Sequence, residues 1–224
     1  MKNLPAEQIA DLRQSLVMPA DIQIADYLGS GARAHVFKAM LVDVHVVVKL
    51  YREQAVQKYR QKYDVDIAEF EYERNQSLVE LAAINKYIAK PYRLYSKSSE
   101  YSHCIVQEQV LGKPLKEIVN ARGGLPNEIL TAGYEIVNHA EANGIHDLDI
   151  SYSNMMVVEQ DGVQIPKLYD FNLLPQHIHP PNPFLGLAIK LGLRAKSHRD
   201  YRNLKKWERH GENAARHALQ NTKV

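Results

Sequence analysis

Three polar residues in the second half of the chain have types and spacing suited to holding a metal ion beside a general base. Asp149 is followed five residues later by Asn154, and Asp170 comes sixteen residues after Asn154, at the end of a short apolar segment. Carboxylate and amide oxygens are hard ligands of the kind Mg²⁺ prefers, together with substrate phosphates. The spacing predicts that Asn154 and Asp170 hold Mg²⁺ and that Asp149 is the base. Taken one at a time, each residue is more typical of a cap or turn.

A glycine-containing segment upstream has the composition of a phosphate-binding turn. Gly29, Ser30 and Gly31 are followed by Ala34 and Val36, with apolar segments on both sides. Glycine lets backbone amides approach a phosphate because no Cβ stands in the way. These five residues are therefore candidates for contact with phosphate. A plain hairpin turn is the alternative.

Lys49 ends the apolar run Val46-Val47-Val48. A buried ammonium needs a partner anion because burying an unpaired charge is costly. Glu73 lies on the apolar stripe of a helical pattern and is the candidate partner, with Glu69 and Glu71 as alternatives. The alternative is that Lys49 lies at the edge of a sheet and points into solvent.

The elements that must position these residues can be read from hydrophobic periodicity. We predict helices over 5–16, 53–86, 126–143, 184–194 and 198–220, and strands within 22–50, 88–96, 103–110, 155–158 and 166–169. A β-rich first half and a helical second half indicate an α+β chain of two lobes. The domains expected are a helical extension over 1–20, an N-lobe over 21–110 and a helical C-lobe over 111–224.

Composition excludes several classes of protein. The chain has 224 residues, of which 45% are hydrophobic and 24% charged, typical of a globular chain. No apolar run approaches the roughly 18 residues of a membrane span, and the N-terminus lacks the pattern of a signal peptide. The one cysteine, Cys104, excludes an internal disulfide and a cysteine-rich zinc site. We therefore expect a cytoplasmic protein.

The charge is unevenly distributed. Residues 190–224 carry 10 Lys and Arg against 3 Asp and Glu, a net charge of +7, whereas residues 1–189 have a net charge of −5. The basic tail is suited to an anionic partner, and a solvated helix face is the alternative. A nucleic-acid partner is not expected, because the tail interleaves only the aromatic residues Tyr201 and Trp207 with its cations.

Taken in order, these motifs resemble those of the protein-kinase-like superfamily, over residues 22–174. The resemblance implies a bilobal fold with an antiparallel-sheet N-lobe and a short, truncated helical C-lobe, and ATP and Mg²⁺ as cofactors. It implies that Gly29–Val36 covers the phosphates, that Lys49 holds them and pairs with Glu73, and that Asp149 is the catalytic aspartate. It further implies that Asn154 and Asp170 bind the metal, that Gln107 is the gatekeeper, and that Glu108 and Val110 belong to the hinge that receives adenine.

The chain departs from the superfamily pattern at several positions. Asp147 stands where a histidine is usual, Ser151 replaces a lysine common in serine/threonine kinases, and Asn172 replaces a glycine. No Ala-Pro-Glu motif follows. These departures imply a minimal or atypical kinase. An inactive scaffold, a pseudokinase, is the alternative.

The segment 197–207 is similar to the closing helix of bacterial lipopolysaccharide-core (Kdo/heptose) kinases. That resemblance implies an anionic sugar-lipid as the acceptor of a phosphoryl group. The amphipathic segment 184–191 and the basic tail would then make peripheral contact with an anionic membrane surface, unless the apolar residues simply cap the lower lobe. A protein serine or threonine, as in short effector kinases secreted by bacteria, is the alternative acceptor.

Overall fold

The computed structural model describes residues 4–96, 102–122, 124–171 and 174–221, with the backbone alone described for 211–221. The chain divides into two compact units. The first comprises Met1–Gln76 and Lys90–Gln109, and the second comprises Ser77–Ala89 and Val110–Val224. The segment 77–89, which the sequence assigns to the N-lobe, thus belongs to the second unit.

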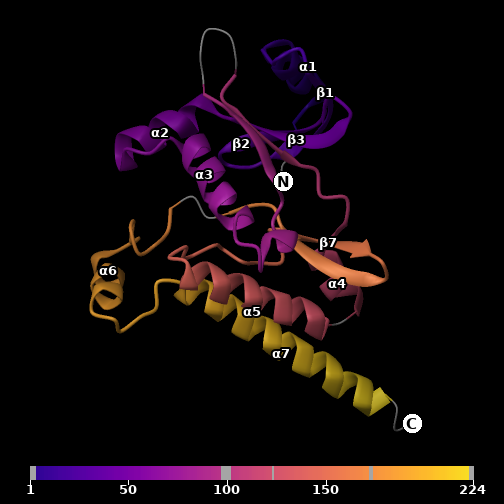
Figure 1. Cartoon of the computed structure of the whole chain (residues 1–224), viewed down its shortest axis with the longest axis vertical. Helices are drawn as coiled ribbons and strands as arrows, with labels where there is room; N and C mark the ends of the chain where they lie inside the picture. Colours follow the sequence, from indigo (N-terminus) through magenta and orange to yellow (C-terminus); the bar gives the residue numbers. More distant parts are fainter. Residues whose placement is uncertain (1–3, 97–101, 123, 172–173, 222–224) are drawn as a thin grey trace. The chain divides into compact units, whose positions relative to one another are not determined.

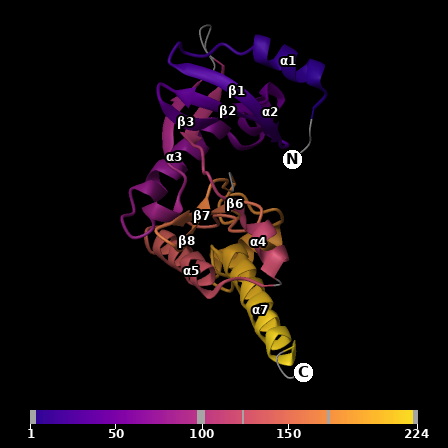
Figure 2. The same cartoon turned by 90° about the vertical axis from the view of Figure 1, so that its right-hand side faces the viewer.

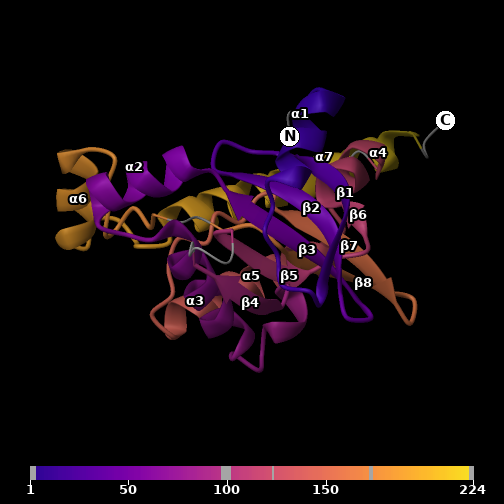
Figure 3. The ribbon, with the colours of Figure 1, turned by 90° about the horizontal axis from the view of Figure 1, so that it is seen from above.

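A five-stranded antiparallel sheet forms the centre of the first unit, in the order β1-β2-β3-β5-β4 (Figures 1 and 3). Its strands are β1 (Ile22–Ser30), β2 (Ala34–Leu41), β3 (Val44–Tyr51), β4 (Pro91–Tyr95) and β5 (Cys104–Glu108). They fall within the segments predicted as strands. Residues 46–51 of β3 are all buried, because β3 is the central strand, paired with β2 and β5.

The helices of the first unit are α1 (Ala6–Gln14), α2 (Glu53–Tyr63) and most of α3 (Ile67–Val79). The single helix predicted over 53–86 is wrong, because Asp64 adopts a left-handed conformation with a φ of 53° and ends α2. Asp66 then caps α3, where its Oδ1 accepts hydrogen bonds from the amides of Ala68 and Glu69 at 3.1 and 3.3 Å. Leu12 and Leu16 pack against the apolar cluster of the sheet.

The second unit combines a small antiparallel sheet with helices. Strands β6 (Lys113–Pro114), β7 (Met155–Gln160) and β8 (Val163–Leu168) pair in that order. The helices are α4 (Leu115–Arg122), α5 (Asn127–Ala142), α6 (Pro183–Lys190) and α7 (His198–Asn221), with a short 3₁₀ turn, η1 (Asn85–Tyr87). The helix predicted over 184–194 ends early because Gly192 turns the chain with a φ of 71°.

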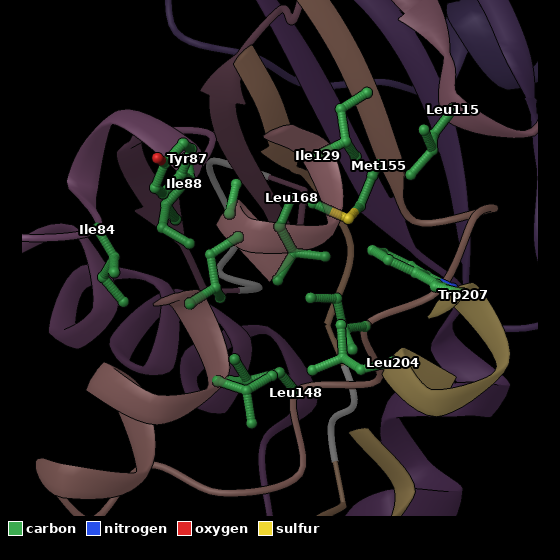
Figure 4. Packing of buried hydrophobic residues seen from close by; sticks show 14 of the residues in the cluster. Ile84, Tyr87, Ile88, Leu115, Ile129, Leu148, Met155, Leu168, Leu204 and Trp207 are labelled. Atoms are coloured by element: carbon green, nitrogen blue, oxygen red, sulfur yellow. The ribbon is translucent and has the colours of Figure 1, made fainter. Parts of the chain in front are cut away.

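Helices α5 and α7 lie side by side (Figures 1 and 2). Gly133 of α5 permits this contact, since a Cβ at that position would lie 2.8 Å from Cδ2 of Leu204 on α7. The apolar cluster of this unit contains Leu148, Met155, Leu168, Leu204 and Trp207 (Figure 4). The segments that bear the candidate catalytic residues thus share one apolar cluster with α7.

None of the helices in the described residues is long and apolar enough to cross a membrane.

Candidate functional site

The glycine-containing segment forms the tip of the β1–β2 hairpin. Gly29 and Ser30 pair with Val36 and His35 across the hairpin, and the Gly31 amide donates to the carbonyl of Ala34 at 2.9 Å. Gly29 has a φ of 144°, in the region that favours glycine. The structure therefore places all five predicted phosphate-contact residues on one hairpin.

Lys49 is 7% exposed and forms a buried ion pair with Glu71. The distance from Nζ of Lys49 to Oε1 of Glu71 is 2.6 Å. The prediction that Glu73 is the partner is wrong. Helix α3 buries the face of Ile67, Glu71 and Leu78, and Glu73 lies on its exposed face.

Tyr51 also contacts this pair and was missed by sequence reasoning. Its hydroxyl donates to Oε2 of Glu71 at 2.5 Å, so the carboxylate holds both a lysine and a tyrosine of β3. The signal was present in the sequence, because residues 49 and 51 point to the same face of a strand.

The predicted hinge residues lie at the end of β5. Gln107 is 3% exposed, and Glu108 is tied to Lys90 by two hydrogen bonds. In these, the Glu108 amide donates to the Lys90 carbonyl at 2.7 Å, and Oε2 of Glu108 accepts from the Lys90 amide at 3.0 Å. Val110, also expected in the hinge, is buried and is the first residue of the segment Val110–Val224 of the second unit.

The β7–β8 hairpin places Asn154 beside the residue that precedes Asp170, and the Asn154 side chain contacts Asp149. Nδ2 of Asn154 donates to the Asp149 carbonyl at 3.0 Å and lies 3.4 Å from its Oδ2. The Asn154 carbonyl accepts from the Tyr169 amide at 3.0 Å, which continues the β7–β8 ladder to the residue before Asp170. Asn172, the position of the usual glycine, lies outside the described residues.

Helix α7 holds the loop that carries Asp149. Asp200 is fully buried, and its carboxylate accepts from the amides of Leu148 and Ile150 at 2.7 and 2.9 Å. Nδ2 of Asn203 donates to the Ile150 carbonyl at 2.8 Å. Burial raises the pKa of Asp200 to about 6, although the two amides favour its charged form. Sequence reasoning missed this role, whose signal is an aspartate within a basic segment.

Asp147, at the position of the usual histidine, is fully buried and paired with Arg199 of α7. Nε of Arg199 lies 2.8 Å from Oδ1 of Asp147 and 3.7 Å from Oδ1 of Asp149. The other oxygen of Asp147 accepts from the Gln176 amide at 2.7 Å. The substitution thus replaces an imidazole with a carboxylate that fixes an arginine beside Asp149.

The donor set at Asn154 and Asp170 fits Mg²⁺ only in part. One amide oxygen and one carboxylate are hard ligands of the kind Mg²⁺ takes alongside water and phosphate oxygens. Over the ranges that the structure describes, no group of three or more His, Cys, Asp or Glu side chains could hold a metal. The residues thus suit an ion that arrives with phosphate, not one caged by protein ligands.

Comparisons with known proteins bear on the superfamily and the fold of this chain. No protein-family model matches the chain. A probable serine/threonine-protein kinase of Clostridium acetobutylicum is 31% identical in an alignment of 158 residues. The match covers 67% of this chain and 22% of the relative. The crystal structure of Rad53 in complex with AMP-PNP has a TM-score of 0.53 and 25% identity, covering 74% of this chain and 42% of that one.

The chain spans less than half the length of either protein. Together, the relative and the structural neighbour support the protein-kinase-like superfamily for this chain, with a mixed α+β fold and an antiparallel five-stranded sheet.

Proposed function

We propose that this chain transfers the γ-phosphoryl group of Mg·ATP to a hydroxyl. The observation that carries the proposal is the loop in which Asn154 is bonded to Asp149 and, through its carbonyl, to the strand end before Asp170. A base and two oxygen ligands at that spacing are the parts that phosphoryl transfer requires. The structural neighbour was crystallised with the ATP analogue AMP-PNP, which supports ATP as the donor.

In this proposal Asp149 accepts the proton of the acceptor hydroxyl. The hydroxyl oxygen forms a bond to the γ-phosphorus of ATP, the bond from that phosphorus to the β-phosphate oxygen breaks, and ADP leaves. Asn154 and Asp170 hold Mg²⁺, which neutralises charge on the phosphates when bound. Lys49, positioned by Glu71, stabilises the negative charge of the phosphates, and the β1–β2 hairpin covers them. Glu108 and Val110 receive the adenine.

Two acceptors fit this chemistry. The name of the Clostridium relative favours a protein serine or threonine. The basic face of α7 favours an anionic sugar-lipid of the lipopolysaccharide-core type, with peripheral contact to an anionic membrane. Exposed apolar side chains of the segment before α7, such as Phe184 and Leu193, support that contact.

The test is ADP release and ATP binding by the purified chain, beside Asp149→Asn and Asp170→Ala. We expect Asp149→Asn to bind ATP normally and to lose about 100-fold or more of turnover, because only the proton acceptor is removed. Asp170→Ala should lose Mg²⁺-dependent binding. An Asp149→Asn variant with full turnover would refute the assignment, and a wild-type chain that binds ATP without turnover would favour the pseudokinase alternative.

To identify the acceptor, the chain is incubated with γ-labelled ATP and either core lipid or whole lysate, and the labelled product is located. Label in the lipid fraction that disappears with Asp149→Asn supports the sugar-lipid. Label in protein serine or threonine supports the protein acceptor.

A further inference from the structure

A basic pocket lies on the outer side of α7, within the second unit. It has a volume of about 380 Å³, in the range of small-molecule sites. Its lining is given by Arg194, Ala195, His198, Tyr201, Arg202, Lys205 and Arg209. Four of these side chains carry a permanent positive charge, and none carries a carboxylate.

Helical spacing explains why the cations gather there. His198, Arg202, Lys205 and Arg209 recur at three- and four-residue intervals, so they share one face of α7. The opposite face carries the buried Asp200, Leu204 and Trp207. The cations and the buried residues thus lie on opposite faces of α7.

Two carboxylates lie on the part of α7 whose side chains the structure describes, residues 198–210, and both are engaged elsewhere. Glu208 accepts a hydrogen bond from the Tyr134 hydroxyl at 2.6 Å, and Asp200 is fully buried against the amides of Leu148 and Ile150. Cations on one helix face at this spacing repel one another, which is destabilising without a counter-ion. Burial and, next, the charge of Arg194 lower the pKa of His198, in keeping with that crowding.

We propose that this pocket binds the phosphate group of an anionic ligand carrying more than one negative charge. Arginine guanidinium groups match phosphate oxygens in two-point hydrogen bonds, and two of the arginines, Arg202 and Arg209, project from the same helix face. The ligand is either a soluble phosphate ester or a lipid headgroup. The site is separate from the residues assigned to ATP and does not depend on phosphoryl transfer.

The test measures binding of inorganic pyrophosphate by calorimetry, without Mg²⁺, to the full chain and to two variants with equal charge change. Arg202→Gln/Arg209→Gln removes two cations from the pocket lining. Lys196→Gln/Lys206→Gln removes two exposed cations of the same region that do not line the pocket. All four positions are exposed, and an unchanged circular dichroism melt confirms that the variants fold.

We expect the pocket variant to bind pyrophosphate at least about tenfold more weakly, because it loses two charge-assisted contacts. The control should change less than about threefold, through long-range charge alone. Equal weakening in both variants, undiminished binding in the pocket variant, or no binding by the wild type would each overturn the proposal. Binding at the nucleotide residues would be recognised because it survives the pocket substitutions.

Sedimentation with vesicles distinguishes the two sources of phosphate. Vesicles that contain phosphatidylglycerol are compared with vesicles of phosphatidylcholine alone. Binding to the former that is lost in the pocket variant, but kept in the control and in Asp149→Asn, assigns the pocket to a lipid headgroup. Pyrophosphate binding without vesicle binding assigns it to a soluble phosphate ester. If Asp149→Asn still binds the vesicles, the result for this pocket stands whatever the activity test shows.

Discussion

The carboxylate of Glu71 neutralises Lys49 in a part of the chain where both side chains are less than one-tenth exposed. A buried ion pair depends on both partners, because removal of one leaves the other charge uncompensated. The hydroxyl of Tyr51 binds the second oxygen of the same carboxylate. This arrangement fixes the lysine in one position, which the proposed contact with phosphate requires.

Glu71→Gln should therefore destabilise the first unit by about 3 kcal/mol and weaken ATP binding. The matched control is Glu73→Gln, which makes the same chemical change on the exposed face of the same helix and should cost less than about 0.5 kcal/mol. Urea denaturation followed by circular dichroism, together with ATP titration, measures both effects. Equal effects of the two substitutions would contradict the assignment of Glu71.

Sequence reasoning chose Glu73 because it treated 53–86 as one helix and placed Glu73 on the apolar stripe of that helix. The left-handed conformation of Asp64 resets the helical phase, so the buried stripe begins at Ile67 and passes through Glu71. An aspartate in this conformation has no distinctive pattern in the sequence, since the residue type also occurs in helices. The lysine, by contrast, could be predicted, because it ends a strand of consecutive apolar residues.

At the scale of elements, α7 is the support of the loop that carries Asp149. Its Asp200 accepts hydrogen bonds from two backbone amides of the loop, and its Asn203 donates one to a loop carbonyl. Its Arg199 lies beside the carboxylates of Asp147 and Asp149. The sequence predicted the bounds of this helix closely but not its role. Its contacts join residues about fifty positions apart, and hydrophobic periodicity reports only which face of a helix is buried.

The raised pKa of Asp200 gives a prediction on stability and pH. A carboxyl whose pKa is about 6 in the folded chain and 3.8 in the unfolded chain binds its proton more tightly when folded. Its contribution to stability is fully present below about pH 4 and is lost as the pH rises through 6. Relative to Asp200→Asn, the wild-type chain should thus lose up to about 3 kcal/mol between about pH 4 and pH 7.

The measurement is urea unfolding at several pH values, followed by the fluorescence of Trp207, the one tryptophan of the chain, which lies in the second unit. The asparagine variant also disturbs the loop, because its amide group cannot accept from both backbone amides. That loss of stability does not change with pH. The observable is therefore how the difference in free energy of unfolding between the wild type and Asp200→Asn varies with pH. A difference that stays constant with pH would show that Asp200 titrates at its ordinary value.

Arg199 is a positioning residue in this scheme, since it acts on the transferred proton only through Asp149. Arg199→Gln should lower kcat by about 100-fold with a smaller change in the KM for ATP, because a displaced base affects the chemical step. Arg199→Lys should recover part of the loss by keeping a cation near Asp147. Lys206→Gln, on an exposed part of the same helix, is the control. Equal loss in the lysine and glutamine variants would indicate a purely structural role.

At the scale of the whole chain, two apolar clusters define two units, and the proposed nucleotide residues are distributed over both. Lys49 belongs to the first unit and Asp170 to the second. The sequence predicted a two-part α+β chain because the pattern changes from strands to helices along it. It could not assign 77–89 to the second unit, since that depends on the pairing of Ile88 with Leu168 and the bond from the Ala89 amide to the Leu168 carbonyl.

If residues of both units bind the same Mg·ATP, a substitution in one unit should also remove the stabilisation that the nucleotide gives to the other unit. A ligand at 100 times its Kd stabilises the folded state by about 2.7 kcal/mol. Mg·ATP should therefore shift the unfolding transition seen by Trp207 in the wild type, and this shift should disappear in Lys49→Met, whose substitution lies in the first unit. Lys38→Met, a partly exposed lysine of β2, should keep it. A full shift in Lys49→Met that is lost in Asp170→Ala would instead mean that the second unit binds the nucleotide by itself.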